Sequence, residues 1–153
     1  MNFSETYHIV PGFKSADHTA GVDSDSVNMG LLHSVCALLQ FGDMSVASPL
    51  VKVYSGATAG TKTTALTFRY KLSPQAAKTA GADVWPSGFS TSASLTVTFD
   101  TDDEKLLVIE VDSAEMTEGE PWLTVELGSQ ATIQQTACVL IGIPRYDHTV
   151  TVI

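Results

Sequence analysis

The chain has 153 residues, of which 44% are hydrophobic and 16% are charged, and its formal net charge at pH 7 is −9. This length and balance indicate one folded domain with a substantial core and exclude a disordered chain. The negative charge also argues against nucleic acid as a partner, because binding to nucleic acid depends on Lys and Arg displacing counterions.

The negative charge is concentrated between residues 100 and 126. That segment holds ten of the 17 acidic residues but one of the eight basic residues, Lys105, so the rest of the chain is neutral. We interpret the segment as a solvated acidic face, with an acidic patch that docks a basic partner as the alternative.

Neither the first 13 residues nor the longest apolar run indicates export or membrane insertion. Residues 1–13 lack the basic start and apolar core of a secretory signal, and the longest apolar run, residues 31–41, is too short to span a bilayer. Two cysteines, Cys36 and Cys138, lie in apolar runs, which favours buried reduced thiols, with a disulfide between distant strands as the alternative.

Residues 1–26 are predicted to form an N-terminal arm and loop ahead of a β-sandwich over residues 27–153. Residues 1–13 have aromatic and apolar anchors without helical periodicity, and Pro11-Gly12 is a turn signal. We expect an extended arm that lies along its own domain or along a neighbouring subunit. Residues 14–26 are polar and are expected to form a loop.

Several segments of the middle of the chain are expected to be strands because apolar residues alternate in them. In the first, alternate residues from Val35 to Phe41 share one face and Cys36 and Leu38 the other, so a buried strand is favoured over a helix. The expected strands are residues 27–41, 50–54, 66–72 and 95–99. Residues 73–94 form a long polar connection, a kind of loop that often serves function. Within it, Trp85 is either a lid on the core or an exposed anchor for a partner, with sugar stacking as a third option.

Three more runs follow between residues 106 and 145. Leu107–Val111 and Trp122–Leu127 alternate, as a strand over a core does, and residues 112–119 between them fit a one-turn helix capped by Asp112 or Ser113 and ended by Gly119. Residues 137–143 do not alternate, so they are expected to be a strand covered on both faces that stops at Pro144. The tail, residues 149–153, alternates again and is expected to be a terminal strand or a second exchanging arm.

About eight strands with little helix predict an all-β protein, an antiparallel β-sandwich, and a jelly roll is the natural closure for eight strands. No catalytic, cofactor or metal site is predicted. The four histidines lack the spacing of zinc ligands, and no nucleophile elbow supports a Ser/His/Asp set. Residues 100–104 resemble part of a calcium loop but lack its central Gly, so a solvated turn is favoured; Asp23 and Asp25 carry the same weak possibility.

The layout of short motifs along the chain resembles the jelly-roll head decoration, or cement, proteins of tailed phages. The motifs that carry this resemblance are Phe3…Tyr7-His8-Ile9-Val10…Gly12, residues 54–60, Phe68-Arg69-Tyr70-Lys71, Val84-Trp85, residues 108–112 with Gly119, residues 122–125, and residues 137–140 with Pro144-Arg145-Tyr146.

The resemblance implies a non-enzymatic virion protein on the outer capsid surface, which would reach it from the host cytoplasm during assembly. Its implied partners are the major capsid protein and further copies of itself, most simply a trimer, with a dimer as the alternative. The candidate partner-binding residues are Phe3, Tyr7, Ile9, Trp85 and Tyr146. Two other functions are open: a tail- or fibre-associated phage sandwich, and a carbohydrate-binding module that uses Trp85. An enzyme on a jelly-roll frame would need a clustered metal set that the scattered histidines do not supply.

Overall fold

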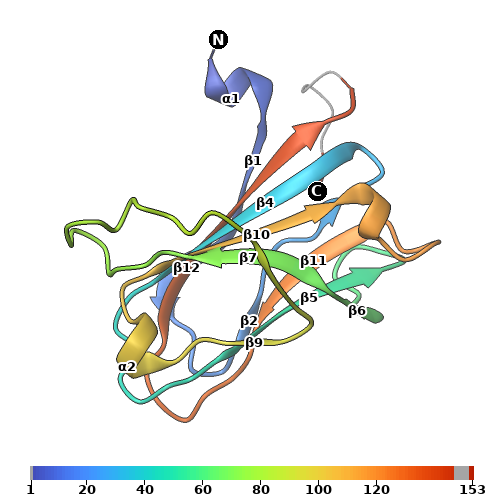
Figure 1. The fold of residues 1–153 in the computed structure, drawn as a ribbon. Coiled ribbons are helices and arrows are strands. Elements are labelled where there is room, and N and C mark those ends of the chain that lie inside the picture. Colours follow the sequence, from blue (N-terminus) through green and yellow to red (C-terminus); the bar gives the residue numbers. More distant parts are fainter. Residues whose placement is uncertain (1, 147–151) are drawn as a thin grey trace.

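The computed structural model describes residues 2–146 and 152–153 and is an all-β sandwich of two antiparallel sheets (Figure 1). The prediction of an antiparallel β-sandwich is confirmed. The described part of the chain has twelve strands, more than the eight expected, because several short strands of two or three residues extend the edges of the sheets.

Sheet A contains the long strands that carry the candidate site. In spatial order its strands are β1 (His8–Asp17), β12 (Gln135–Pro144), β4 (Leu32–Phe41), β10 (Leu106–Asp112), β7 (Phe68–Leu72) and β8 (Ser90–Ser92).

Sheet B packs against the inner face of sheet A. Its order is β2 (Val22–Asp23), β11 (Trp122–Leu127), β5 (Leu50–Gly56) and β6 (Thr64–Leu66), while β3 (Val27–Asn28) also pairs with β11 and β9 (Leu95–Thr96) with β5. The long strands β4, β5, β10, β11 and β12 therefore alternate between the sheets along the chain, as in a jelly roll.

The core lies between the sheets and follows the alternation read from the sequence. Alternate residues of β4 from Val35 to Phe41 are buried, as are those of β10 from Leu107 to Val111 and of β11 from Leu123 to Leu127. Strand rather than helix is thus confirmed for residues 32–41. A turn separates this strand from β3, so the predicted strand 27–41 is two strands.

The N-terminal segment lies along its own domain, one of the two places expected for it, but its first residues are helical and not extended. Residues 3–6 form a short helix, α1 (Phe3–Thr6), and residues 8–17 form β1, which pairs with β12 along its own domain. The register of β1 shifts between Pro11 and Phe13 and again between Phe13 and Ala16. These bulges break the period of two along β1. Lys14–Asp17 belong to this strand and not to the loop that the polarity of residues 14–26 predicted.

Two other predicted strands change partner or end early. The alternating run 66–72 splits at Thr67, so that Leu66 ends β6 in sheet B while Phe68 begins β7 in sheet A. The expected strand 95–99 is shorter, since β9 stops at Thr96 and α2 (Phe99–Asp102) follows.

The remaining turn and tail predictions have mixed outcomes. The one-turn helix after β10 is present as the 3-10 helix η1 (Ser113–Glu115), with Asp112 at its N-cap, but it ends before Gly119, which has a positive φ of 79° in the following turn. Residues 149–151 of the predicted terminal strand lie outside the described residues. Val152 is buried, and its carbonyl accepts a hydrogen bond from the backbone of Asn28 at 2.7 Å.

Candidate partner-binding surface

One side of the sandwich presents an apolar surface to solvent. It is the outward face of β1, β12 and β4, which we call the outer A face. We use the name for the apolar part of that face, defined by Ile9, Pro11, Ser34, Cys36, Leu38, Ala137, Val139, Ile141 and Ile143, none of which is charged; beyond this part the same strands carry the exposed polar residues Lys14, Asp17, Gln40 and Gln135. Ile9 is 47% exposed, Val139 36% and Ile143 44%, which is unusual for large apolar side chains on a sheet.

Strand register makes this surface continuous. Ile141 lies opposite Ile9 on one side and opposite Cys36 on the other, and Val139 lies in the same way between Pro11 and Leu38. Side chains directly opposite one another across strands are in contact range. The outer A face is therefore built of apolar rows that run across three strands.

The outer A face corrects a prediction and reveals residues that the sequence reasoning missed. The non-alternating run 137–143 was expected to be covered on both faces, but sheet B covers one face and nothing in the described chain covers Val139 and Ile143. Leu38, Val139, Ile141 and Ile143 were not predicted to be partner-binding residues. The lack of alternation was the signal that could have identified them.

Helix α1 borders one end of the outer A face. The rings of Phe3 and Tyr7 lie 4.6 Å apart between centroids, and both line a hollow of about 290 Å³ together with Cys36, Ile141 and Ile143. Because Ile9 pairs with Ile141, the structure brings three of the five candidate residues, Phe3, Tyr7 and Ile9, to this one surface.

The connection between β7 and β8, residues 73–89, borders the other end of β4 and projects from the sandwich (Figure 1). Trp85 is half-buried, outside the core, and lines a hollow of about 280 Å³ beside Gln40 and Leu106. Val84 is 70% exposed at the adjoining position. The ammonium of Lys71 lies 4.5 Å from the centroid of the Phe89 ring and holds the end of the loop to β7.

Tyr146, the fifth candidate, lies just beyond β12 and is exposed. The preceding residue, Arg145, is tied down, since its backbone N–H donates to the Leu31 carbonyl at 2.9 Å and its Nε donates to the Leu32 carbonyl at 2.7 Å. Among the described residues, no ring contact joins Tyr146 to Phe3, Tyr7 or Trp85, and Tyr146 lines neither the hollow beside Phe3 nor the one beside Trp85.

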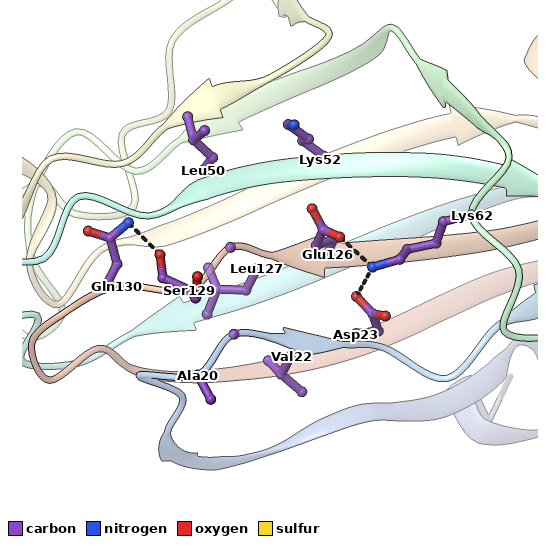
Figure 2. Close-up of a pocket in the computed structure, with 12 residues that line it drawn as sticks. Ala20, Val22, Asp23, Leu50, Lys52, Lys62, Glu126, Leu127, Ser129 and Gln130 are labelled. Atoms are coloured by element: carbon purple, nitrogen blue, oxygen red, sulfur yellow. Dashed lines mark hydrogen bonds and ion pairs between the residues drawn. The ribbon is translucent and has the colours of Figure 1, made fainter.

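The outward face of sheet B is charged, in contrast to the outer A face. A hollow of about 570 Å³ lies on it, where Lys62 donates to Asp23 at 2.9 Å and to Glu126. Figure 2 shows the Lys62 side chain reaching these two carboxylates. Lys52 lines the same hollow. These groups are partly exposed, so their ion pairs add little to stability, but they make this face strongly hydrated.

The acidic segment 100–126 does not form one docking patch. Its acids have partners at separate places: Asp102 with Lys105 at 3.4 Å, Asp112 with Arg69 at 2.7 Å, Glu120 with Thr64 at 3.2 Å, and Glu126 with Lys62. Asp102 and Asp112 are near opposite ends of β10. The alternative of a single acidic surface for a basic partner is therefore not supported.

The two cysteines lie on opposite faces of sheet A and are both free. Cys138 points into the core, and burial raises the pKa of its thiol to about 12. Cys36 points outward and is half-buried, which corrects the expectation that both are buried; partial burial and the nearby Glu110 raise its pKa to about 11. Both thiols are thus protonated and poorly reactive at neutral pH.

The part of the chain that the structure describes has no cluster of metal-ligating side chains. Residues 2–146 and 152–153 contain no group of three or more His, Cys, Asp or Glu side chains placed to hold a metal ion. Within the same residues, no helix has the length and apolar character needed to cross a membrane.

The geometry defines the class of protein as a jelly-roll β-sandwich with one apolar and one charged outer face. No protein-family model matches the chain, and no curated protein matches it in sequence. Among solved structures, its fold is similar to the crystal structure of the SPBc2 prophage-derived protein YomS, with a TM-score of 0.53 and 13% identity over 88% of this chain and 92% of that chain. At this level of identity the similarity concerns the fold alone.

Proposed function

We propose that this chain is a structural virion protein that binds the outer surface of a tailed-phage capsid, with the major capsid protein as its partner, and stabilises the shell. The observation that carries the proposal is the loop 73–89, which projects from a rigid sandwich (Figure 1) and exposes the apolar side chains of Val84 and Phe89. The likeness of the fold to a prophage-derived protein supports a phage origin.

In this function the sandwich is a scaffold and the loop 73–89 makes the contact with the shell. A rigid scaffold that presents a projecting loop is a common arrangement for recognition. Val84 and Phe89 offer exposed apolar side chains on this loop, and Trp85 offers a large aromatic surface beside them. Each contact is small, but many copies on one lattice reinforce the shell together. The role has no catalytic step and needs neither cofactor, nucleic acid nor membrane.

The test is to mix the purified chain with shells of the encoding phage that were assembled without it, and to sediment them. The wild-type protein is expected to pellet with the shells up to a fixed ratio of copies. Val84→Asp is expected to weaken this binding, whereas Val46→Asp, at another highly exposed valine in the β4–β5 turn, leaves it unchanged. Wild-type protein that stays in the supernatant contradicts the proposal.

Two alternatives use the same surface. A tail- or fibre-associated protein would pellet with tails and not with shells. A carbohydrate-binding module is favoured by the hollow beside Trp85, which also has Gln40, Asp83 and Glu104 in its lining, the pairing of aromatic and polar groups that a sugar requires. A glycan that shifts the fluorescence of the wild type but not of Trp85→Phe, which keeps Trp122, would favour this alternative.

A further inference from the structure

We propose that a second copy of this chain covers the outer A face, packed sheet against sheet about a two-fold axis. The inference stands apart from capsid binding, because it concerns the surface that joins two copies and not the loop that contacts the shell.

The distribution of charge on the chain favours a second copy as the partner that covers the outer A face. The chain carries a net charge of −9, so two copies repel one another over most orientations. The nine side chains of the outer A face carry no charge, so copies that meet there pair uncharged rows. The nearest acid is Glu110, which lies opposite Cys36 at the border of the face and opposite Arg69 on its other side. Beside the face, the charge of Arg69 on β7 is already neutralised by Asp112 at 2.7 Å and Glu115 at 3.6 Å.

The composition of β12 and β4 shows that a cover is missing. Strands with apolar residues on both faces are typical of sheets that are covered on both sides. The inward residues Cys138 and Leu140 of β12 lie against the core, whereas Val139 and Ile143 face solvent. A second sheet packed on this side would bury these outward residues about 10 Å from its own.

The sheet edges are poorly suited to join two copies. β1 is the long edge strand of sheet A, and Pro11 together with two register shifts interrupts the row of hydrogen-bonding groups along it. The opposite edge strand, β8, has three residues, and the sheet B edges end in strands of two or three residues. Association through the face is therefore favoured over the addition of a strand.

The size of the face is more than half that of a standard interface. Strands β12 and β4 have ten residues each and so extend about 33 Å, and the three strands β1, β12 and β4 span about 14 Å. The resulting flat area is about 460 Å² per copy, to which the side chains and α1 add, and a standard interface buries about 800 Å² per partner.

The charged outer face of sheet B favours a two-fold dimer over a ring of three. A ring of three would place the outer A face of one copy against a different surface of the next. The outer face of sheet B is not complementary, since Lys52, Lys62 and Glu126 would lose their hydration there. Of the two oligomers expected from the sequence, the face thus favours the dimer.

The test is the mass of the full chain in solution by sedimentation equilibrium over a range of concentrations. A mass of twice 16.3 kDa is expected for the wild type. Val139→Lys is expected to raise the dissociation constant about 100-fold or more, because a lysine is buried without a partner. Val46→Lys, the same change at a valine away from the face, is expected to remain dimeric.

A second variant and a check of the fold distinguish a loss of association from misfolding. Ile143→Lys changes a more exposed residue of the same face, and circular dichroism checks that each variant keeps the β spectrum. A wild type that is monomeric or trimeric throughout overturns the inference, and so does a dimer that neither folded lysine variant dissociates. These results leave the sedimentation of the chain with shells as a separate question, so the two proposals can fail independently.

Discussion

Cys36 on β4 and Ile141 on β12 lie directly opposite one another, and both side chains point away from the core. Ile9 continues their row on one side and Glu110 continues it on the other. Across one sheet, the outward surface therefore changes from apolar on β1, β12 and β4 to charged on β10 and β7. This change within a single row marks the border of the surface that we assign to a partner.

The positions of the cysteines predict two steps of alkylation. At low protein concentration, N-ethylmaleimide is expected to add once to the folded chain, slowly and at Cys36, because a pKa of about 11 leaves little thiolate at neutral pH. Cys138 is expected to react after unfolding. Mass spectrometry with and without denaturant counts the adducts, and Cys36→Ser should abolish the first one. Rapid double modification of the folded chain would contradict the placement of Cys138.

Phe68 is expected to be a key residue of the core. It is fully buried at the point where the chain passes from β6 to β7, so Phe68→Ala should lower the free energy of unfolding by about 3–5 kcal/mol. Phe89→Ala is the matched control, since this ring is 43% exposed and its main contact is Lys71; its cost should stay below about 1 kcal/mol. Urea unfolding measures both, and equal losses would show that Phe68 is not in the core.

Gly56 is required by the close approach of the chain at Thr61. A Cβ at Gly56 would run into the carbonyl oxygen of Thr61, whereas a Cβ at Gly88 would meet no atom within 4 Å. Gly56→Ala is expected to destabilise the fold by more than about 1 kcal/mol, and Gly88→Ala to be neutral or stabilising by up to about 1 kcal/mol. Thermal melting of the two variants compares them directly; a neutral Gly56→Ala would mean that residues 57–61 move freely.

Asp17 is expected to make the stability depend on acid pH. Its carboxylate accepts hydrogen bonds from the Thr19 hydroxyl at 2.7 Å and the Gln134 N–H at 3.1 Å, and these bonds lower its pKa below 3.8. A lowered pKa in the folded state gives stability above the unfolded value, and this stability is lost as the pH falls through the folded value.

The measurement is the melting temperature from about pH 6 to about pH 2.5 for the wild type, Asp17→Asn and Thr19→Ala. Asp17→Asn should be less stable than the wild type at the upper end, and the difference should shrink towards the acid end. Thr19→Ala should also lower the melting temperature more at the upper end of the pH range than at the acid end, because it removes the hydroxyl donor. If the melting temperatures of all three proteins change in parallel with pH, Asp17 does not cause the loss of stability in acid.

The sequence predicts a strand well where alternation is unbroken and the strand keeps one partner. Leu107–Val111 and Leu123–Leu127 are of this kind, and their inward residues are buried as expected. The jelly roll followed from the number of strands, but the pairing of β1 with β12 joins residues more than 100 positions apart, which local patterns do not encode. The bulges near Phe13 also interrupt the alternation of β1, so the local pattern does not predict this strand over its full length.

Two other features of the structure could not be predicted from the alternation of apolar residues, each for a different physical reason. At Thr67 the chain changes sheets while Leu66 and Phe68 both stay in the core, so the alternation continues although the hydrogen-bond partner changes. At Val139 and Ile143 the apolar residues indicated cover on both faces, and the missing cover is not part of the described chain. Phe3 and Tyr7 were predicted to bind a partner because they are aromatic residues near the N-terminus; the structure places them beside the outer A face, and their role there stays a prediction.

The most direct test of the central claim is the melting temperature of purified shells, measured by calorimetry with and without this chain. We predict that saturating wild-type protein raises the melting temperature of the shell, and that Val84→Asp raises it less at the same concentration because fewer copies are bound. An unchanged shell melting temperature at full occupancy of the wild type would contradict a stabilising role on the capsid.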